Sequence, residues 1–200
     1  MTAIPVSFTR LTHGLPRGAI AAVVALAIAG MIASLWAAPG LPGFLGAALW
    51  LIMLAIAAID ARLFIIPNEL TAVGLILALA NAAVQAPDAM AQSIIMALVR
   101  AAVLASMFYA LRALYRRLRG RDGLGLGDVK LAGVAGAWLG LLTIPIAIEI
   151  AALAALAVFG IRLYRGGRSF DSALKFPFGL FLAPSIWLGW LLETTLLGTF

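Results

Sequence analysis

The chain has 200 residues, of which 64% are hydrophobic and only 11% are charged, with a formal net charge of +6. About a quarter of the residues in a soluble globular domain are charged, so this composition excludes that class and predicts an integral membrane protein. The chain has no cysteine and a single histidine, His13, which excludes disulfides, thiol nucleophiles and metal sites built from cysteine or histidine clusters.

Continuous apolar runs predict helices that cross the membrane, because the strands of a membrane β-barrel would alternate apolar and polar residues. Seven runs are long enough, or nearly so, to cross about 30 Å of hydrocarbon. In chain order they cover residues 18–37, 43–60, 69–86, 91–112, 130–143, 145–164 and 178–198. We therefore predict an all-α, multi-pass protein that forms a single domain over residues 1–200. The first run exceeds the apolar core of a cleaved signal peptide, so we expect it to be a retained span.

The connections between the predicted spans alternate between basic segments and segments without lysine or arginine. Basic residues precede the first span and follow the second, fourth and sixth; they are Arg10, Arg17, Arg62, Arg112, Arg116, Arg117, Arg119, Arg121, Arg162, Arg165, Arg168 and Lys175. The other three connections contain neither lysine nor arginine. Cytoplasmic loops carry the excess of basic residues, so the N-terminus is predicted to be cytoplasmic and the C-terminus periplasmic. We therefore attribute the positive net charge to the orientation of the chain in the membrane and not to binding of nucleic acid.

Two acidic residues lie at the cytoplasmic ends of predicted spans. Asp60 ends the second span and Asp128 opens the fifth, and acids in such places are costly and indicate function. If these spans pack together, the two carboxyl groups share a site and cannot both ionise cheaply, so one keeps its proton. That is the arrangement of aspartic proteases, in which the other carboxylate activates a water molecule. Three alternatives remain: idle solvated acids, an ion- or proton-coupled transporter that uses the same acids, and a scaffold without chemistry.

A glycine-rich stretch, DGLGLGDVKL, leads into Asp128. Glycine permits a close approach of another backbone, so Gly125 and Gly127 are candidate substrate contacts, and we expect the glycines to prevent a helix from starting before the aspartate. Small residues follow at four-residue spacing, at Ala132, Gly136 and Gly140, which favours close helix packing. The stretch matches neither a dinucleotide fingerprint nor a P-loop.

Three motifs resemble those of type IV prepilin peptidases, the GxGD aspartic membrane proteases. GLGLGDVKLAGVAGAWLG resembles the GxGD signature, IDARLFIIPNELT the first acidic motif, and KFPFGLFLAP the late segment, in family order between Asp60 and Pro184. The resemblance implies that Asp60 and Asp128 are catalytic, and that no metal or cofactor takes part. It implies cleavage of basic leader peptides from prepilins or pseudopilins at the cytoplasmic face of the bacterial inner membrane. Membrane lipids and pilus-assembly machinery are the other implied partners.

The chain departs from the larger members of that family, which carry a cysteine-rich cytoplasmic insertion and also methylate the new N-terminus. No cysteine and no insertion of domain size is present, so N-methyltransferase activity is not expected, and the compact form resembles the Flp/Tad-type enzymes. Phe178 and Gly179 are candidate contacts for the leader peptide.

We expect structural roles, and not catalytic ones, for three further side chains. Asn68 is expected to cap the third span. Arg100 and Glu149 lie at comparable depths inside predicted spans, so they are expected to form an intramembrane ion pair.

Overall fold

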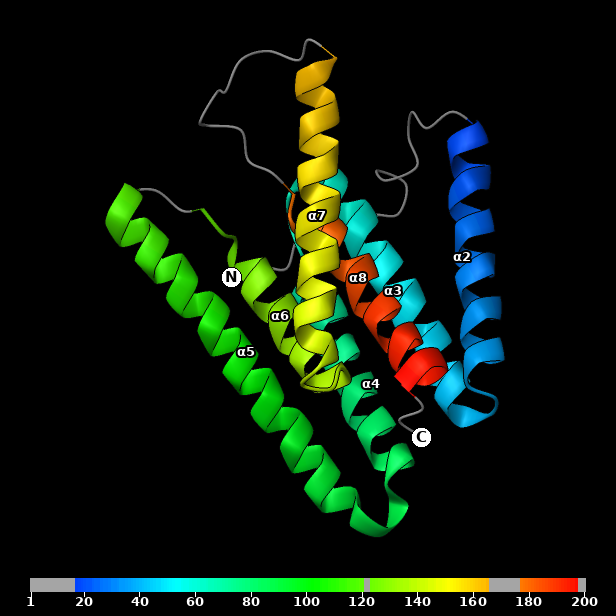
Figure 1. Cartoon of the computed structure of the whole chain (residues 1–200). Helices are drawn as coiled ribbons and strands as arrows, with labels where there is room; N and C mark the ends of the chain where they lie inside the picture. The colour runs from blue at the N-terminus through cyan, green and yellow to red at the C-terminus, as the bar shows by residue number, and fades with distance from the viewer. Residues whose placement is uncertain (1–16, 121–122, 166–176, 198–200) are drawn as a thin grey trace.

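The computed structural model describes residues 17–120, 123–165 and 177–197, and over these residues the chain is a bundle of helices (Figure 1). In chain order the elements are α2 (Arg17–Ala37), α3 (Leu41–Leu63), α4 (Asn68–Gln85), η1 (Pro87–Ala89), α5 (Met90–Arg119), α6 (Leu126–Trp138), α7 (Thr143–Tyr164), α8 (Gly179–Leu192) and η2 (Glu193–Leu197). His13, Asp122 and several basic residues of the topology prediction lie outside the described residues, namely Arg10, Arg121, Arg168 and Lys175.

Six helical segments of the described residues are long and apolar enough to cross a membrane. They are α2, α3, α4, α5 with η1, α7, and α8 with η2. The remaining helix, α6, has 13 residues and, at about 1.5 Å per residue, is roughly 20 Å long. The helices agree with the predicted all-α, multi-pass membrane protein, whereas the seven crossings and the orientation stay predictions.

The predicted end of the fourth span, at residue 112, is too early. Helix α5 continues to Arg119 and ends where Gly120 adopts a φ of 69°, with its amide donating to the Arg116 carbonyl. The intervening residues are mostly leucine, alanine and arginine, which are strong helix formers. The helix therefore extends beyond its apolar part until the first glycine supplies a left-handed end.

The expectation that the glycines hold off a helix until Asp128 is wrong. Helix α6 begins at Leu126, with Gly125 as its N-cap and Asp128 as its third residue. The Asp128 carboxylate accepts a hydrogen bond from the Gly125 amide, and an acid at this position stabilises a helix start. The non-helical part of the glycine stretch thus ends at Gly125. At its other end, α6 stops at Trp138, before the predicted residue 143.

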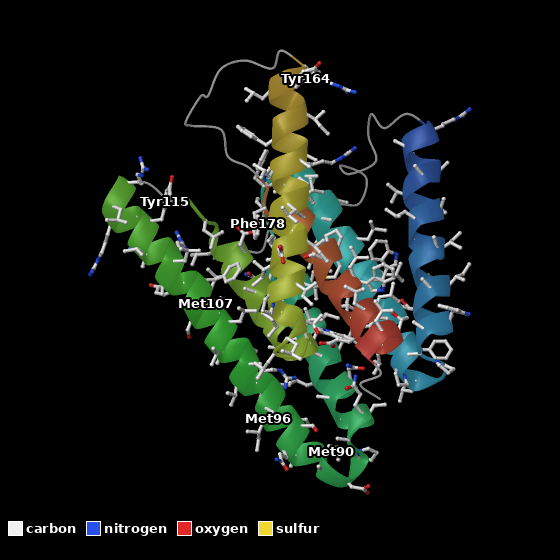
Figure 2. The ribbon with its side chains drawn as sticks, viewed as in Figure 1. Met90, Met96, Met107, Tyr115, Tyr164 and Phe178 are labelled. Carbon is white, nitrogen blue, oxygen red and sulfur yellow. The ribbon has the colours of Figure 1, made fainter. Side chains whose placement is uncertain are left out.

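Helices α3, α6 and α8 form the centre of the bundle, with fully buried side chains such as Leu49, Leu131 and Ile186. Helices α2, α5 and α7 lie around them and expose many apolar side chains, including Met96 and Met107 on α5 (Figure 2). Such an apolar exterior suits contact with lipid.

Tryptophan side chains tie α2 to the centre. The Trp50 Nε1 of α3 donates to the Leu26 carbonyl at 3.1 Å, and the Trp187 Nε1 of α8 donates to the Ser34 hydroxyl at 2.9 Å. The first predicted span is therefore an integral part of the folded bundle.

Candidate active site

Asp60 lies in the last turn of α3 and faces the start of α8. Its side chain is 5% exposed, and its Oδ2 accepts a hydrogen bond from the Leu180 amide at 3.0 Å. Backbone amides at a helix N-terminus carry partial positive charge and attract anions. The start of α8, more than a hundred residues later in the chain, therefore supplies the polar partner of this carboxylate.

Asp128 is held in the same manner by the start of its own helix. Its side chain is 8% exposed, and its Oδ2 accepts from the Gly125 amide at 3.1 Å. Burial raises the pKa of Asp128 to about 6, the Gly125 hydrogen bond opposes that rise, and the charge of Asp60 adds to it.

The two aspartates line one pocket of about 220 Å³. Its wall comes from the end of α3, the connection that follows it, and the start of α6: Asp60, Phe64, Ile65, Ile66, Gly125, Leu126, Gly127, Asp128 and Lys130. Gly125 and Gly127, the predicted substrate contacts, thus belong to the pocket. Segments about sixty residues apart in the sequence meet here because α3 and α6 both pack into the centre of the bundle.

Two glycines allow the helix starts to approach the end of α3. A Cβ on Gly127 would lie 2.9 Å from the Cβ of Ile66, and a Cβ on Gly179 would lie 2.8 Å from the Asp60 Oδ2 and 2.7 Å from the Ile66 Cδ1. Ile66 is buried and is the shared contact of both glycines. A side chain at either glycine would push α6 or α8 away from the Asp60 end of α3.

Phe178 and Gly179 occupy different places relative to the pocket. Gly179 is buried directly beside the Asp60 carboxylate, whereas Phe178, labelled in Figure 2, is half-buried and packs against the hydrophobic core. Neither residue is part of the pocket wall. The structure thus places Gly179, and not Phe178, next to an acidic side chain.

Lys130 and Asn68 meet at the edge of the pocket. The Lys130 Nζ donates a hydrogen bond to the Asn68 Oδ1, and both side chains are exposed. The expectation that Asn68 caps α4 is wrong, because Pro67 occupies the cap position and no side chain caps that helix. Asn68 is the first residue inside the helix, so its oxygen is available to Lys130.

The apolar part of the pocket wall was missed by sequence reasoning. Phe64, Ile65 and Leu126 are 49%, 55% and 52% exposed although they line the pocket. Phe64 also has a φ of 53°, a left-handed conformation that is unusual for a bulky residue. All three lie inside the two acidic motifs, just outside the apolar spans. Their position next to the aspartates in the sequence is the feature that could have identified them as part of the pocket wall.

The predicted ion pair between Arg100 and Glu149 is wrong. Glu149 is exposed on α7. The Arg100 Nε instead donates to the Gly136 carbonyl at 3.2 Å, and the charge that acts on the guanidinium is that of Glu193. Equal depth in two spans does not determine which face of each helix carries the charge. Glu193 lies close to the predicted end of the last span, where an acid carries no signal of a partner inside the membrane.

Comparison with known proteins identifies a related family. Residues 45–161, which include both aspartates, match the model of the type IV leader peptidase family. Among curated proteins, the chain is 36% identical over 136 residues to a prepilin leader peptidase/N-methyltransferase of Burkholderia pseudomallei, covering 66% of this chain and 40% of the relative. The protein of the same description from Xanthomonas campestris is 34% identical over 161 residues, covering 78% of this chain and 53% of the relative.

A third relative with that description, from Aeromonas hydrophila, is 32% identical over 175 residues, covering 84% of this chain and 54% of the relative. The chain thus spans about half the length of the curated relatives it matches. No solved structure shows significant similarity to it.

Proposed function

The chain belongs to the type IV leader peptidase family, and we propose that it is an aspartic endopeptidase that removes the leader peptide from type IV prepilins or pseudopilins. The observation that carries this proposal is the pair of buried carboxyl groups, from α3 and α6, on one pocket. The descriptions of the relatives as prepilin leader peptidases support the same substrate class. Membership of a peptidase family does not favour the alternative function of an ion- or proton-coupled transporter.

The proposed chemistry uses one proton shared between Asp60 and Asp128. The ionised carboxylate takes a proton from water as the water oxygen bonds to the scissile carbonyl carbon, and the protonated carboxyl donates its proton to the carbonyl oxygen. As the C–N bond of the tetrahedral intermediate breaks, the carboxyl that took the water proton donates it to the leaving nitrogen. One hydroxyl of the intermediate returns its proton to the other carboxylate as the carbonyl re-forms, so the dyad again holds one proton. Burial of both groups on one pocket supports this division of roles, because two charged carboxylates that share a site are unfavourable.

We place the cleavage at the cytoplasmic face of the bacterial inner membrane. Arg62 lies in the last turn of α3, two residues after Asp60, and the arginines in the last turn of α5 precede the glycine stretch that leads to Asp128. Such basic segments face the cytoplasm. The exposed apolar side chains of Phe64, Ile65 and Leu126 offer contacts for an apolar stretch of a substrate. The absence of a domain-sized insertion between the spans supports a Flp/Tad-like substrate.

We also propose that the chain cleaves without methylating the product. Its relatives are described as N-methyltransferases as well as peptidases, but the 200 residues contain no cysteine and no insertion between spans. Mass spectrometry of the processed pilin, made by this chain alone, would test this: an unmodified N-terminus is expected, and a methylated one would contradict it.

The peptidase proposal is tested by co-expression with candidate Flp/Tad-like prepilins, with leader removal followed by gel shift. Asp60→Asn and Asp128→Asn keep the size of each side chain but remove its acid function, so each is expected to lower processing by at least about 10³-fold. Glu149→Gln is the matched control, because it also replaces a carboxylate by an amide of equal size and Glu149 is exposed and not part of the pocket wall. Full processing by either aspartate variant would contradict the dyad mechanism.

A further inference from the structure

The end of α6 that faces away from the pocket contains charged groups that the proposed chemistry does not use. With 13 residues, α6 is shorter than the roughly 20 residues that a membrane crossing needs. The last carbonyl groups of any helix lack partners within the helix, and inside a membrane water does not replace them. The short helix therefore needs side-chain partners at its end.

Arg100 of α5 is that partner. Its Nε donates to the Gly136 carbonyl at 3.2 Å and its Nη2 to the Ala137 carbonyl at 3.5 Å. The backbones are also in direct contact, since a Cβ on Gly136 would lie 2.5 Å from the Arg100 carbonyl oxygen. A cation at a helix C-terminus is favourable, so Arg100 ends α6 and holds it to α5.

Glu193 completes the arrangement from the other side. It directly follows α8, in the η2 turn, and its Oε1 accepts a hydrogen bond from the Gly140 amide, just beyond the end of α6. Its charge acts on Arg100, and each charge offsets the cost of burying the other. The end of α8 is thereby attached to the end of α6.

The opposite ends of the same two helices hold the catalytic pair. Helix α6 has 13 residues and carries Asp128 at its start, and α8 has 14 residues and its start supplies the amide that holds Asp60. Two helices of nearly equal length thus run from the pocket to the end of the bundle where Arg100 and Glu193 lie. Asp60 belongs to α3, but its carboxylate accepts from the Leu180 amide at the start of α8. A shift of α6 along α8 would therefore move Asp128 relative to the amide that holds Asp60.

We propose that Arg100 and Glu193 are positioning residues that fix the register of α6 against α8 and so hold Asp60 and Asp128 at reacting distance. This role rests on the proposed peptidase function. Misplacing a reacting group by about 1 Å can cost about a hundredfold in rate. The pair therefore affects the chemical step from the far end of the bundle.

The first test measures cleavage of a purified prepilin by Glu193→Gln, Arg100→Gln and the double variant. Glutamine at 193 keeps an acceptor for the Gly140 amide but removes the charge, so each single variant is expected to lower kcat about tenfold or more with KM unchanged. The double variant leaves no unpaired charge and is expected to recover part of that loss. Glu149→Gln, an exposed glutamate on α7, is the control and is expected to match the parent.

The second test reads the register without relying on cleavage. Since the chain has no cysteine, Gly189→Cys with Leu139→Cys gives a single pair between α8 and the end of α6, at a place where a Gly189 Cβ would lie 3.1 Å from the Leu139 Cδ1. Disulfide formation requires Cβ atoms within about 4.5 Å. The disulfide is expected to form readily in the parent and severalfold more slowly with Glu193→Gln or Arg100→Gln.

The outcomes separate the two proposals. If the parent cleaves no candidate prepilin, the peptidase proposal fails, and the disulfide rates still decide the positioning role. Positioning is overturned if kcat falls without a change in disulfide rate, if the single variants match the parent in both measurements, or if the double variant is no better than either single one. Arg100→Lys, which keeps the charge, replaces Arg100→Gln if that variant does not accumulate.

Discussion

Gly179 leaves no room for a side chain beside the Asp60 carboxylate. A methyl group there would approach both the Asp60 Oδ2 and the Ile66 Cδ1 to less than 3 Å, so Gly179→Ala must move the start of α8 or rotate the carboxylate. Overpacking of this kind costs about 1–3 kcal/mol. We expect prepilin cleavage to fall between about tenfold and a hundredfold, measured by single-turnover gel assay.

Gly160→Ala is the matched control for that substitution. Gly160 is also helical, in α7, but a Cβ at this position meets nothing within 4 Å. Cleavage is expected to be unchanged, and thermal stability in detergent equal or slightly higher. Equal activity of the two alanine variants would show that the close approach of α8 to Asp60 is not needed.

The raised pKa of Asp128 predicts the alkaline limit of the activity. Because burial favours the neutral carboxyl, Asp128 keeps its proton up to a pH of about 6 and loses it above that pH, instead of near the ordinary value of about 4. Above this limit Asp128 is charged and can no longer donate a proton. We expect kcat in detergent to decline with an apparent pKa near 6, a value that belongs to the pair; a rate that is flat through this pH would contradict the prediction.

At the level of residues, the sequence could identify the acids but not their partners. Asp60 and Asp128 were recognisable from their position at the ends of apolar spans and from their motifs. Leu180, whose amide holds Asp60, carries no such signal, because any residue has a backbone amide. Lys130 with Asn68, and Arg100 with Glu193, depend on the rotation of each helix about its axis, which depth and composition do not determine.

Helix α6 depends on its glycines for contact with α5. A Cβ on Gly136 would lie 2.5 Å from the Arg100 carbonyl oxygen, whereas a Cβ on Gly133, one turn earlier, would lie 3.6 Å from the Ala105 Cβ, an ordinary contact. We therefore expect Gly136→Ala to lower the free energy of unfolding by about 1–3 kcal/mol and to reduce cleavage. Gly133→Ala is expected to be neutral or stabilising. Thermal unfolding in detergent checks both, and an equal effect would contradict the assigned packing.

At the level of elements, the apolar runs predicted which segments are helical, and the errors lie at the ends. The first span was predicted over residues 18–37 and the helix is Arg17–Ala37, because both ends are marked by a change from apolar to charged or proline-containing sequence. For α5 and α6 the apolar run and the helix do not coincide. Helix α5 continues past its apolar run because arginine is a strong helix former. Helix α6 begins before its apolar run because the Asp128 side chain stabilises the first turn.

The whole molecule has its basic connections at one end and its connections without lysine or arginine at the other. The turns that follow α2, α4 and α6 lie at one end of the bundle, and the ends of α5 and α7, with their arginines, lie at the other (Figure 1). This arrangement is what the alternation of charge along the sequence predicts. It also places the Lys130 edge of the pocket on the side that carries the basic residues.

Single cysteines can test the orientation, because the chain has none of its own. Asp88→Cys and Leu142→Cys lie in turns without lysine or arginine, and Leu118→Cys and Tyr164→Cys in basic helix ends, all at exposed positions. With an impermeant maleimide, we expect the first two to react in intact cells whose outer membrane has been permeabilised, and the last two only after lysis. The reverse pattern would invert the orientation. Protection of Leu142→Cys alone would mean that α6, at about 20 Å, does not complete a crossing, and Asp128 would then lie on a re-entrant helix.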